Sequence, residues 1–225
     1  MSGTQPAVDF LSLAGDFRRM STTNGTALAE SDTRGARRKP ESFSKLKRAA
    51  RKLFVERGYH ATRPQDIARE AGLGHGTFYL HFPDKRACFL AFVEDARSEL
   101  DSYLRSRVAP DASLEKFLAT MLHAIYEYSE THPGVLNAAM TDEAVIDAEG
   151  AQAVPLLQRW GRDWAEIIRT AVDAGIASAD YNPEIIGQAI VGALHQTGSE
   201  GAATRRSREE VVDNLTRFLV RALKP

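Results

Sequence analysis

A short stretch around residue 80 carries hydroxyl, imidazole and aromatic side chains and no carboxylate. Residues 75–82 are His-Gly-Thr-Phe-Tyr-Leu-His-Phe. On a helix, where successive residues are about 100° apart, Phe78 and Phe82 would face inward. The outward positions are then Gly76, Thr77 and Leu80, and the flanking positions are Tyr79 and His81. Such a helix can donate hydrogen bonds to phosphates and fit a DNA major groove.

The residues before this stretch predict another short helix and a tight turn. Pro64 suits the first helical position, because its missing N–H needs no partner there. An apolar stripe at helical spacing follows, made of Ile67, Ala68 and Ala71. Gly72 suits the left-handed end of a helix, and Leu73 can fill the angle between two helices. We therefore predict a helix-turn-helix. The alternative is a small buried hairpin with Tyr79 and His81 as ordinary boundary residues.

Charge is distributed unevenly along the chain. Residues 34–86 contain 14 Lys and Arg against 5 Asp and Glu, a net charge of +9, whereas the whole chain has a net charge of −1. This leaves −2 for residues 1–33 and −8 for residues 87–225. A basic segment beside an acidic remainder indicates that only one part of the chain meets a polyanion.

Composition excludes several other classes. The 225 residues are 43% hydrophobic and 26% charged, as in globular proteins. No apolar run approaches the roughly 18 residues of a membrane span, and Asp9 interrupts the only stretch near the start that is apolar enough to suggest a signal peptide. The single cysteine, Cys88, cannot form an internal disulfide and fits a reducing compartment. We expect a cytoplasmic protein.

The chain divides into three predicted regions. Residues 1–40 are expected to be disordered and to end in a basic arm, which either stays solvated or reaches phosphates or a minor groove. The arm consists of Arg34, Arg37, Arg38 and Lys39. Residues 41–86 form the helix-turn-helix DNA-binding domain, whose first helix should run from about Ser42 or Ser44 to Arg57 and stop at Gly58. Residues 87–225 form a helical ligand-binding and dimerisation domain.

The expected fold is all-α. A long helix should run from about Lys85 to Val108, and another should cover about residues 133–147. No segment alternates with a period of two, so we predict no strands and about nine helices.

The last two predicted helices are apolar enough to need a partner surface. They start near Asn182–Pro183 and at the capping box that begins with Ser207. Either they complete the core of a monomer, or they form a four-helix bundle with a second copy. We expect a homodimer, because one short reading helix contacts few base pairs.

The helix-turn-helix and the helix before it resemble the tetracycline-repressor (TetR) family of bacterial transcription regulators. The match comprises Ala-Ala-Arg-Lys-Leu-Phe-Val-Glu-Arg-Gly-Tyr at residues 49–59, Thr62, and residues 66–68, 71–73, 76–79, 81–82 and 84–85. Two positions depart from the family pattern. Gly74 stands where a capping Ser or Thr is usual, and Arg63-Pro64 replaces a small hydroxyl and a β-branched residue.

The resemblance implies specific contacts with a palindromic DNA operator. Phosphate contacts would come from Thr77, Tyr79, His81 and Lys85. Base edges would lie closest to His75, Gly76, Tyr79 and Leu80. Arg63 and Gln65, at the start of the preceding helix, complete the candidate DNA contacts. Leu80 would touch a thymine methyl group or a sugar.

The resemblance also implies a small-molecule effector that releases the operator, with no cofactor. The long helix after residue 85 would transmit the change by linkage. Candidate effector contacts are Tyr126, Asn137, Trp160, Trp164, His195 and Gln196. Each of them has an ordinary alternative as a core or surface residue.

Two other functions remain open on sequence grounds. The first is a metal sensor or an enzyme using His123 and Glu127, four residues apart, with His132 and Asp142–Glu143 beyond. No HExxH, CxxC or phosphate-binding glycine loop supports it, so we expect neither a metal site nor catalysis. The second is a nonspecific architectural DNA-binding protein, for which the acidic remainder of the chain is unusual.

Overall fold

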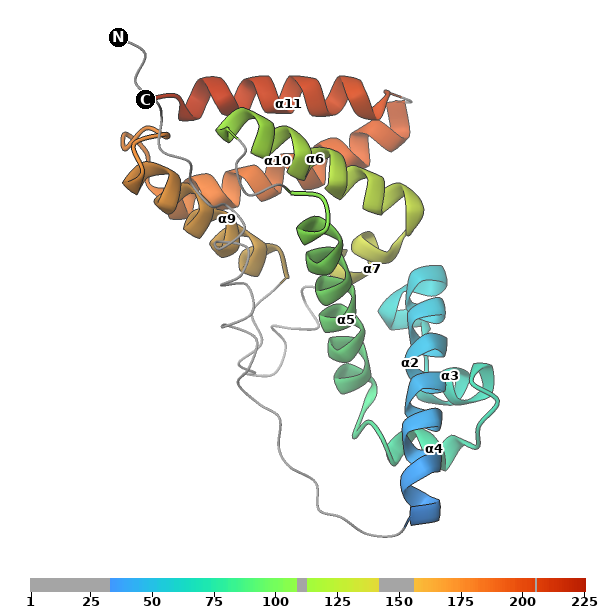
Figure 1. Cartoon of the computed structure of the whole chain (residues 1–225). Helices are drawn as coiled ribbons and strands as arrows, with labels where there is room; N and C mark the ends of the chain where they lie inside the picture. The colour runs from blue at the N-terminus through green and yellow to red at the C-terminus, as the bar shows by residue number, and fades with distance from the viewer. Residues whose placement is uncertain (1–32, 109–112, 142–155, 205) are drawn as a thin grey trace. The chain divides into compact units, whose positions relative to one another are not determined.

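The computed structural model describes residues 33–108, 113–141, 156–204 and 206–225 (Figure 1). Every regular element in these ranges is an α-helix, which confirms the predicted all-α fold with about nine helices. The helices are α2 (Thr33–Ala61), α3 (Pro64–Glu70), α4 (His75–Tyr79), α5 (Lys85–Arg105), α6 (Leu114–Thr131), α7 (Val135–Thr141), α9 (Leu156–Asp173), α10 (Pro183–Thr204) and α11 (Arg208–Leu223). Within the described ranges, none of them combines the length and hydropathy that a membrane crossing requires.

The described residues pack into two units. The N-terminal unit takes those of Asn24–Glu99 and His132–Ala153, and the C-terminal unit takes those of Leu100–Thr131 and Val154–Pro225. Packing therefore continues past residue 86, where we expected the DNA-binding domain to end. The start of α5 packs on α2 through aromatic rings. The ring centroid of Phe54 in α2 lies 5.2 Å from that of Phe89 and 5.7 Å from that of Phe92, both in α5. Such ring pairs stabilise beyond the area that they bury.

Helix α2 is longer than the sequence predicted. It begins at Thr33 rather than near Ser42 or Ser44, and Pro40 lies inside it. Residues 36–39 are Ala-Arg-Arg-Lys, all strong helix formers, so the basic residues expected in a disordered arm belong to a helical backbone. The rest of the expected extension, residues 1–32, lies outside the described residues. The predicted stop is present, because the helical backbone breaks at Gly58 with φ of 76°.

The turn between α3 and α4 has the predicted geometry. Gly72 has φ of 67°, and the amide of Leu73 donates to the carbonyl of Ala68 over 2.9 Å. Ile67 and Phe78 are fully buried, so each of the two short helices turns an apolar side toward the core. Helix α4 is shorter than predicted, because it ends at Tyr79 rather than near Phe82.

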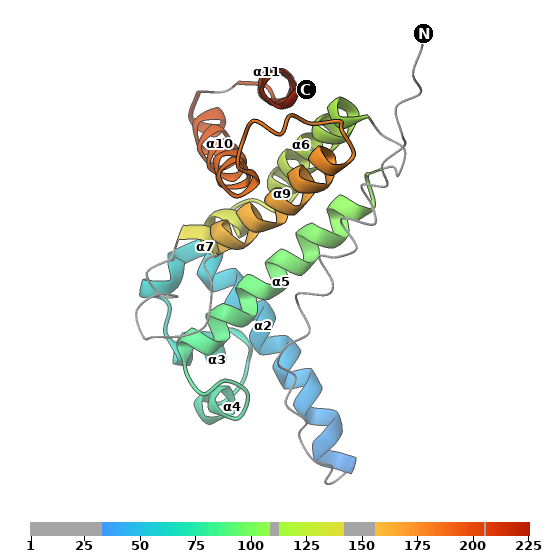
Figure 2. The same cartoon turned by 90° about the vertical axis from the view of Figure 1, so that its left-hand side faces the viewer.

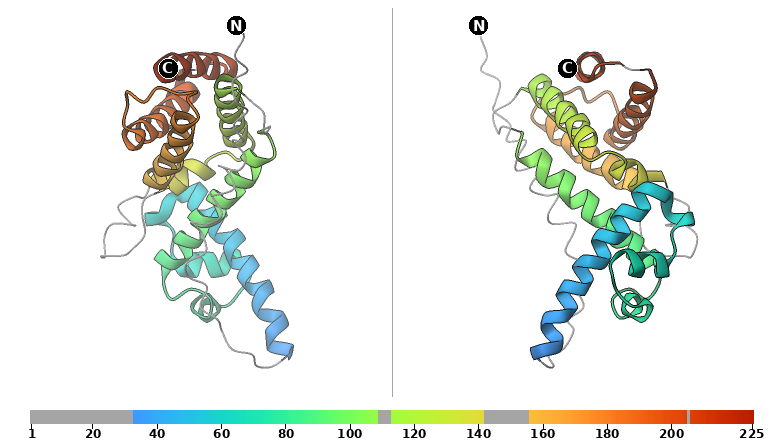
Figure 3. Two further views of the ribbon diagram at one scale, coloured as in Figure 1. Left: turned by 60° about the vertical axis from the view of Figure 1, so that its left-hand side comes forward. Right: turned by 90° about the vertical axis from the view of Figure 1, so that its right-hand side faces the viewer.

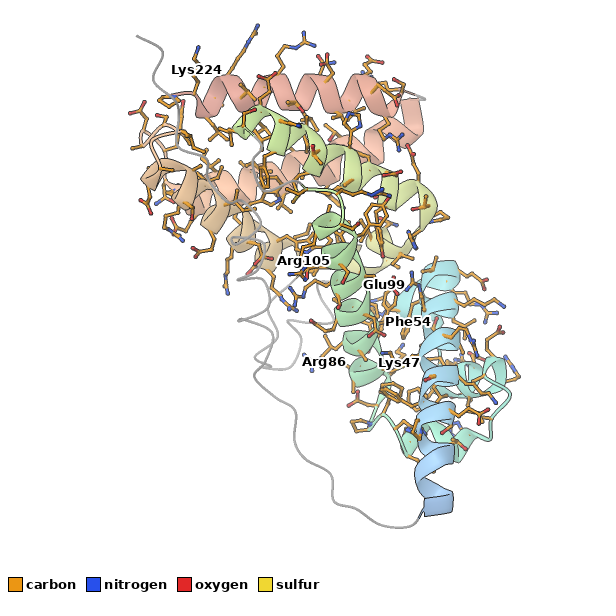
Figure 4. All side chains as sticks on the ribbon, in the orientation of Figure 1. Lys47, Phe54, Arg86, Glu99, Arg105 and Lys224 are labelled. Carbon is orange, nitrogen blue, oxygen red and sulfur yellow. The ribbon has the colours of Figure 1, made fainter. Side chains whose placement is uncertain are left out.

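Two parallel ion pairs join α2 to the first part of α5. The ammonium of Lys47 lies 2.7 Å from Asp95, and the guanidinium of Arg51 donates to both oxygens of Glu99 at 2.6 and 2.7 Å. Figure 4 shows Lys47 and Phe54 pointing from α2 toward α5, where Glu99 lies. The pairs are partly exposed, so each contributes little by itself, but together with the aromatic contacts they hold α5 against α2 as far as Glu99.

The C-terminal unit is a packed set of helices. Helix α10 lies against α9, and α11 lies against α6 (Figures 2 and 3). A Cβ atom added at Gly187 would lie 2.1 Å from the carbonyl oxygen of Gly161, so α9 and α10 approach backbone to backbone. The predicted cap of α11 is present, since Ser207 accepts from the amide of Glu210 over 3.1 Å. The predicted helix over residues 133–147 is described only as α7, because residues 142–155 lie outside the described ranges.

Candidate nucleic-acid interface

Helix α4 presents the side chains that the sequence singled out. Phe78 is buried, whereas Tyr79 is 49% and Leu80 78% exposed. His75 and Gly76 are also exposed, and Thr77 is half-buried. The rings of His75 and Tyr79 meet edge to face at 5.2 Å, so the two residues form one continuous surface. The side chain of Leu80 is more exposed than that of Tyr79. Exposure of an apolar side chain to water is unfavourable.

Gly76 has no packing reason to be glycine. Among the described residues, a Cβ atom built at this position would meet nothing within 4 Å, and the φ of Gly76 is not in the positive range. Glycine in a helix costs roughly 0.5–1 kcal/mol relative to alanine. The chain thus keeps a costly residue on an open surface, as expected where another molecule approaches the backbone closely. Gly74 is also unstrained, and α4 begins without a side-chain cap, as its sequence predicted.

The side chains at the start of α3 are exposed as well. Arg63 is the N-cap residue and makes no side-chain cap, and Pro64 occupies the first helical turn as predicted. Arg63 and Gln65 are exposed, and Arg63 forms no ion pair with another described residue. Both side chains are therefore available to a ligand at this end of the helix.

His81 has a partner that the sequence did not suggest. Its Nε2 atom lies 2.7 Å from the hydroxyl of Ser42, and its ring lies 5.6 Å from that of Phe43. Both partners belong to α2, 38 or 39 residues earlier in the chain. No spacing rule joins positions so far apart, which explains why sequence reasoning missed them.

Lys85 is similarly held from within the protein. Its ammonium donates to the carbonyl oxygen of Tyr59 over 2.9 Å and lies 4.0 Å from the centroid of the Tyr59 ring. An ammonium has three donors, so the carbonyl occupies one of them. The ammonium of Lys85, predicted to contact a phosphate, therefore already binds a carbonyl and a ring within the protein.

Ion pairs reduce the charge that the basic segment can offer to DNA. At least five of its cations have carboxylate partners: Lys45 with Glu41, Lys47 with Asp95, Arg51 with Glu99, Lys52 with Glu70, and Arg69 with Asp66. The hydrogen bond and charge of Lys52 lower the pKa of Glu70, and those of Glu70 raise the pKa of Lys52. Arg48 is exposed and forms no ion pair with another described residue. The sequence reasoning did not single it out.

The candidate effector contacts have different surroundings. Trp164 is buried beside Phe117 in the core of the C-terminal unit, and Trp160 is half-buried at the edge of that core. Tyr126 of α6 reaches α10, where its hydroxyl lies 2.7 Å from that of Thr197. Burial raises the pKa of Tyr126, and the bond to Thr197 offsets this only in part.

The remaining candidates are more exposed. His195 is half-buried and Gln196 exposed on the same helix as Thr197, whereas Asn137 is exposed on α7 in the N-terminal unit. The structure thus places Tyr126, His195 and Gln196 on or beside α10. It places the two tryptophans in packing roles.

The described residues that could have formed a metal site do not gather into one, and Glu127 has a different partner. Glu127 lies 3.5 Å from the guanidinium of Arg107, and His123 is exposed. Asp142 and Glu143 lie outside the described ranges. Within those ranges, no three histidine, cysteine or acidic side chains gather where they could hold a metal ion.

Two family models match the chain along almost its whole described length. Residues 46–92 match the model for bacterial regulatory proteins of the tetR family. Residues 95–224 match the model for the tetracyclin repressor-like C-terminal domain. The chain belongs to the tetR family of bacterial transcription regulators, which confirms the resemblance drawn from residues 49–85 and identifies it as a DNA-binding regulator.

Individual relatives agree with this membership. The transcriptional regulator AcuR of Cereibacter sphaeroides is 28% identical over 192 residues, which cover 82% of this chain and 85% of AcuR. The fold is similar to that of the fatty acid degradation regulator FadR from Bacillus halodurans, with a TM-score of 0.64 at 17% identity over 85% of this chain and 97% of that one. It is also similar to a gamma-butyrolactone receptor described as ArpA-like, with a TM-score of 0.61 at 18% identity over 84% and 90%.

Proposed function

We propose that this regulator is a homodimeric repressor that binds a palindromic operator through α4 and leaves it when a small molecule binds the C-terminal unit. The main observation in support of DNA binding through α4 is the exposure of Leu80 beside Tyr79. An apolar residue and a phenol side by side on an uncharged helix surface suit a groove that offers both methyl groups and hydrogen-bond acceptors.

The proposed DNA contacts divide by chemistry. His75, Gly76, Tyr79 and Leu80 would meet base edges, with the bare backbone at Gly76 allowing the helix to come close. Arg63, Gln65, Thr77, His81 and Lys85 would hold phosphates and sugars, which orient the protein without reading sequence. Arg48, exposed on α2, joins the second group.

The proposed dimer forms through α10 and α11. On α10, the exposed residues Ile185, Ala189 and Gly192 recur at helical spacing and are apolar or small. On α11, Val212, Thr216 and Leu219 face the core, whereas Phe218 is 62% exposed. An apolar face that remains after the core is complete supports the four-helix bundle over the monomeric alternative.

The proposed effector site lies in the C-terminal unit around Tyr126, His195 and Gln196. A small molecule that prefers the conformation unsuited to the operator must weaken DNA binding by the same coupling free energy. Helix α5, continuous from Lys85 to Arg105, is the proposed transmitter. We propose action by binding rather than catalysis, in the cytoplasm, where chromosomal DNA is found.

Selection of duplexes from a random library tests the DNA-binding part. At about 150 mM salt, the chain should retain a palindrome and bind it far more tightly than random duplex. Equal affinity for both would instead support a nonspecific architectural protein. Affinity for the selected duplex should fall steeply as salt rises, because phosphate contacts release counterions.

Sedimentation or size-exclusion measurements test the dimer. Phe218→Glu should yield monomers, because it places a charge in the proposed apolar interface. Arg217→Glu adds the same side chain at the neighbouring exposed position, which pairs with Asp213 on its own helix, and should remain dimeric. Dimers of Phe218→Glu would exclude this interface.

A further inference from the structure

A hydrogen bond between two side chains joins the turn that follows the reading helix to α2. The hydroxyl of Ser42 and the Nε2 atom of His81 are 2.7 Å apart, and both side chains are half-buried. Helix α4 ends at Tyr79, so His81 lies just beyond the last helical residue. This bond therefore joins two elements at the point where the reading helix ends.

Aromatic contacts surround the same bond. The ring of Phe43 lies 5.6 Å from that of His81 and 5.4 Å from that of Phe82, both at tilted angles. Two successive residues of α2 thus contact the imidazole, one through a hydroxyl and one through a ring face or edge. The ring of Phe82 in turn lies 5.5 Å from buried Phe78 of α4. Phe43 is connected in this way to the inward face of the reading helix.

Serine suits this position chemically. A hydroxyl both donates and accepts, so Ser42 can donate to a neutral imidazole or accept from a protonated one. The hydroxyl can therefore pair with the imidazole of His81 in either charge state. Alanine could do neither.

We propose that Ser42 is a positioning residue, which holds the His81 ring in the orientation that contacts a DNA phosphate. This rests on the proposed role of His81 as a phosphate contact. A side chain fixed before binding loses less rotamer freedom when the complex forms, so fixing it tightens the complex without any new contact to DNA. The DNA-binding site then includes the part of α2 around residue 42, which precedes residues 46–92 matched by the N-terminal family model.

Variants of the full chain test this role, with the duplex of about 30 bp, roughly three helical turns, that the wild-type chain selects from a random library. Ser42→Ala should weaken binding to each half-site by about two- to tenfold, the loss expected when one side chain must be ordered on binding. Ser42→Thr keeps the hydroxyl and should restore most of the affinity. Ser44→Ala is the matched control: its hydroxyl is exposed and donates to the carbonyl of Pro40 at 3.0 Å, so its affinity should equal that of the wild type.

A double-mutant cycle distinguishes positioning from a general effect on folding. In a His81→Ala background, Ser42→Ala should cause no further loss, because the ring that it orients is gone. An equal loss in both backgrounds, or wild-type affinity of Ser42→Ala, would overturn the proposal. Wild-type affinity of His81→Ala would instead show that His81 is not a phosphate contact. Failure of the wild-type chain to select any duplex would overturn the proposed function itself, and this inference with it.

Discussion

The ammonium of Lys85 lies 4.0 Å above the ring of Tyr59 and donates to the carbonyl oxygen of the same residue. Tyr59 follows the break in α2 at Gly58, and Lys85 is the first residue of α5. One side chain therefore connects the end of the first helix of the DNA-binding unit to the start of the proposed transmitter. The family resemblance implied a phosphate contact for Lys85, and the structure adds an internal role.

Lys85→Met tests that internal role. Losing a cation–π contact and a charged hydrogen bond should lower the free energy of unfolding by about 1–3 kcal/mol. Urea or thermal denaturation would measure the change. Lys116→Met, at an exposed lysine of α6, should change stability by less than about 0.5 kcal/mol. Equal stabilities of the two variants would mean that the contact with Tyr59 contributes nothing to the fold.

Leu80 and Phe78 should separate binding from folding. Leu80→Ala removes an exposed side chain, so its unfolding free energy should stay within about 0.5 kcal/mol of the wild type, while its affinity for the selected operator falls. Phe78→Ala removes a fully buried ring and should cost about 3–5 kcal/mol. Denaturation and gel-shift measurements on both proteins would check this. An unchanged operator affinity for Leu80→Ala would show that Leu80 does not touch DNA.

Gly76→Ala should change stability and affinity in opposite directions. The added Cβ atom meets no other described atom within 4 Å, and alanine favours the helix by roughly 0.5–1 kcal/mol, so the variant should unfold at a higher denaturant concentration. The same methyl group would separate α4 from the base edges and weaken operator binding. A variant that is more stable and binds equally well would contradict close approach at this position.

Cys88 should be inert in the folded protein. Burial raises its pKa from 9.0 to about 12, so the reactive thiolate is scarce at neutral pH. A thiol reagent at pH 8 should label the protein only in denaturant. Because the pKa of Cys88 is raised in the folded protein, the protonated thiol contributes to stability below pH 9, and this contribution is lost as the pH rises toward 12. Cys88→Ala should reduce that alkaline loss, and rapid labelling of the native protein would contradict the burial.

Local sequence patterns were sufficient for the helix-turn-helix and for the all-α fold. Pro64, Gly72 and Gly58 act through their own backbone preferences, and Phe78 faces inward because of helical periodicity. These effects depend only on near neighbours, so they could be predicted from the sequence. The start of α2 is harder to predict, because a run of Arg and Lys suits a basic arm and also favours helix.

Tertiary structure decided which charges and side chains are available for binding. Lys47 and Arg51 appear in the sequence as part of a DNA-binding charge, but α5 supplies Asp95 and Glu99 to them from 48 residues away. In the same way, Ser42 meets His81 and Tyr59 meets Lys85 only in the folded chain. The sequence by itself determined the elements and the family, because those follow from local preference and residue type. The partners of each polar side chain depend on how the helices pack, and that packing is a property of the whole chain.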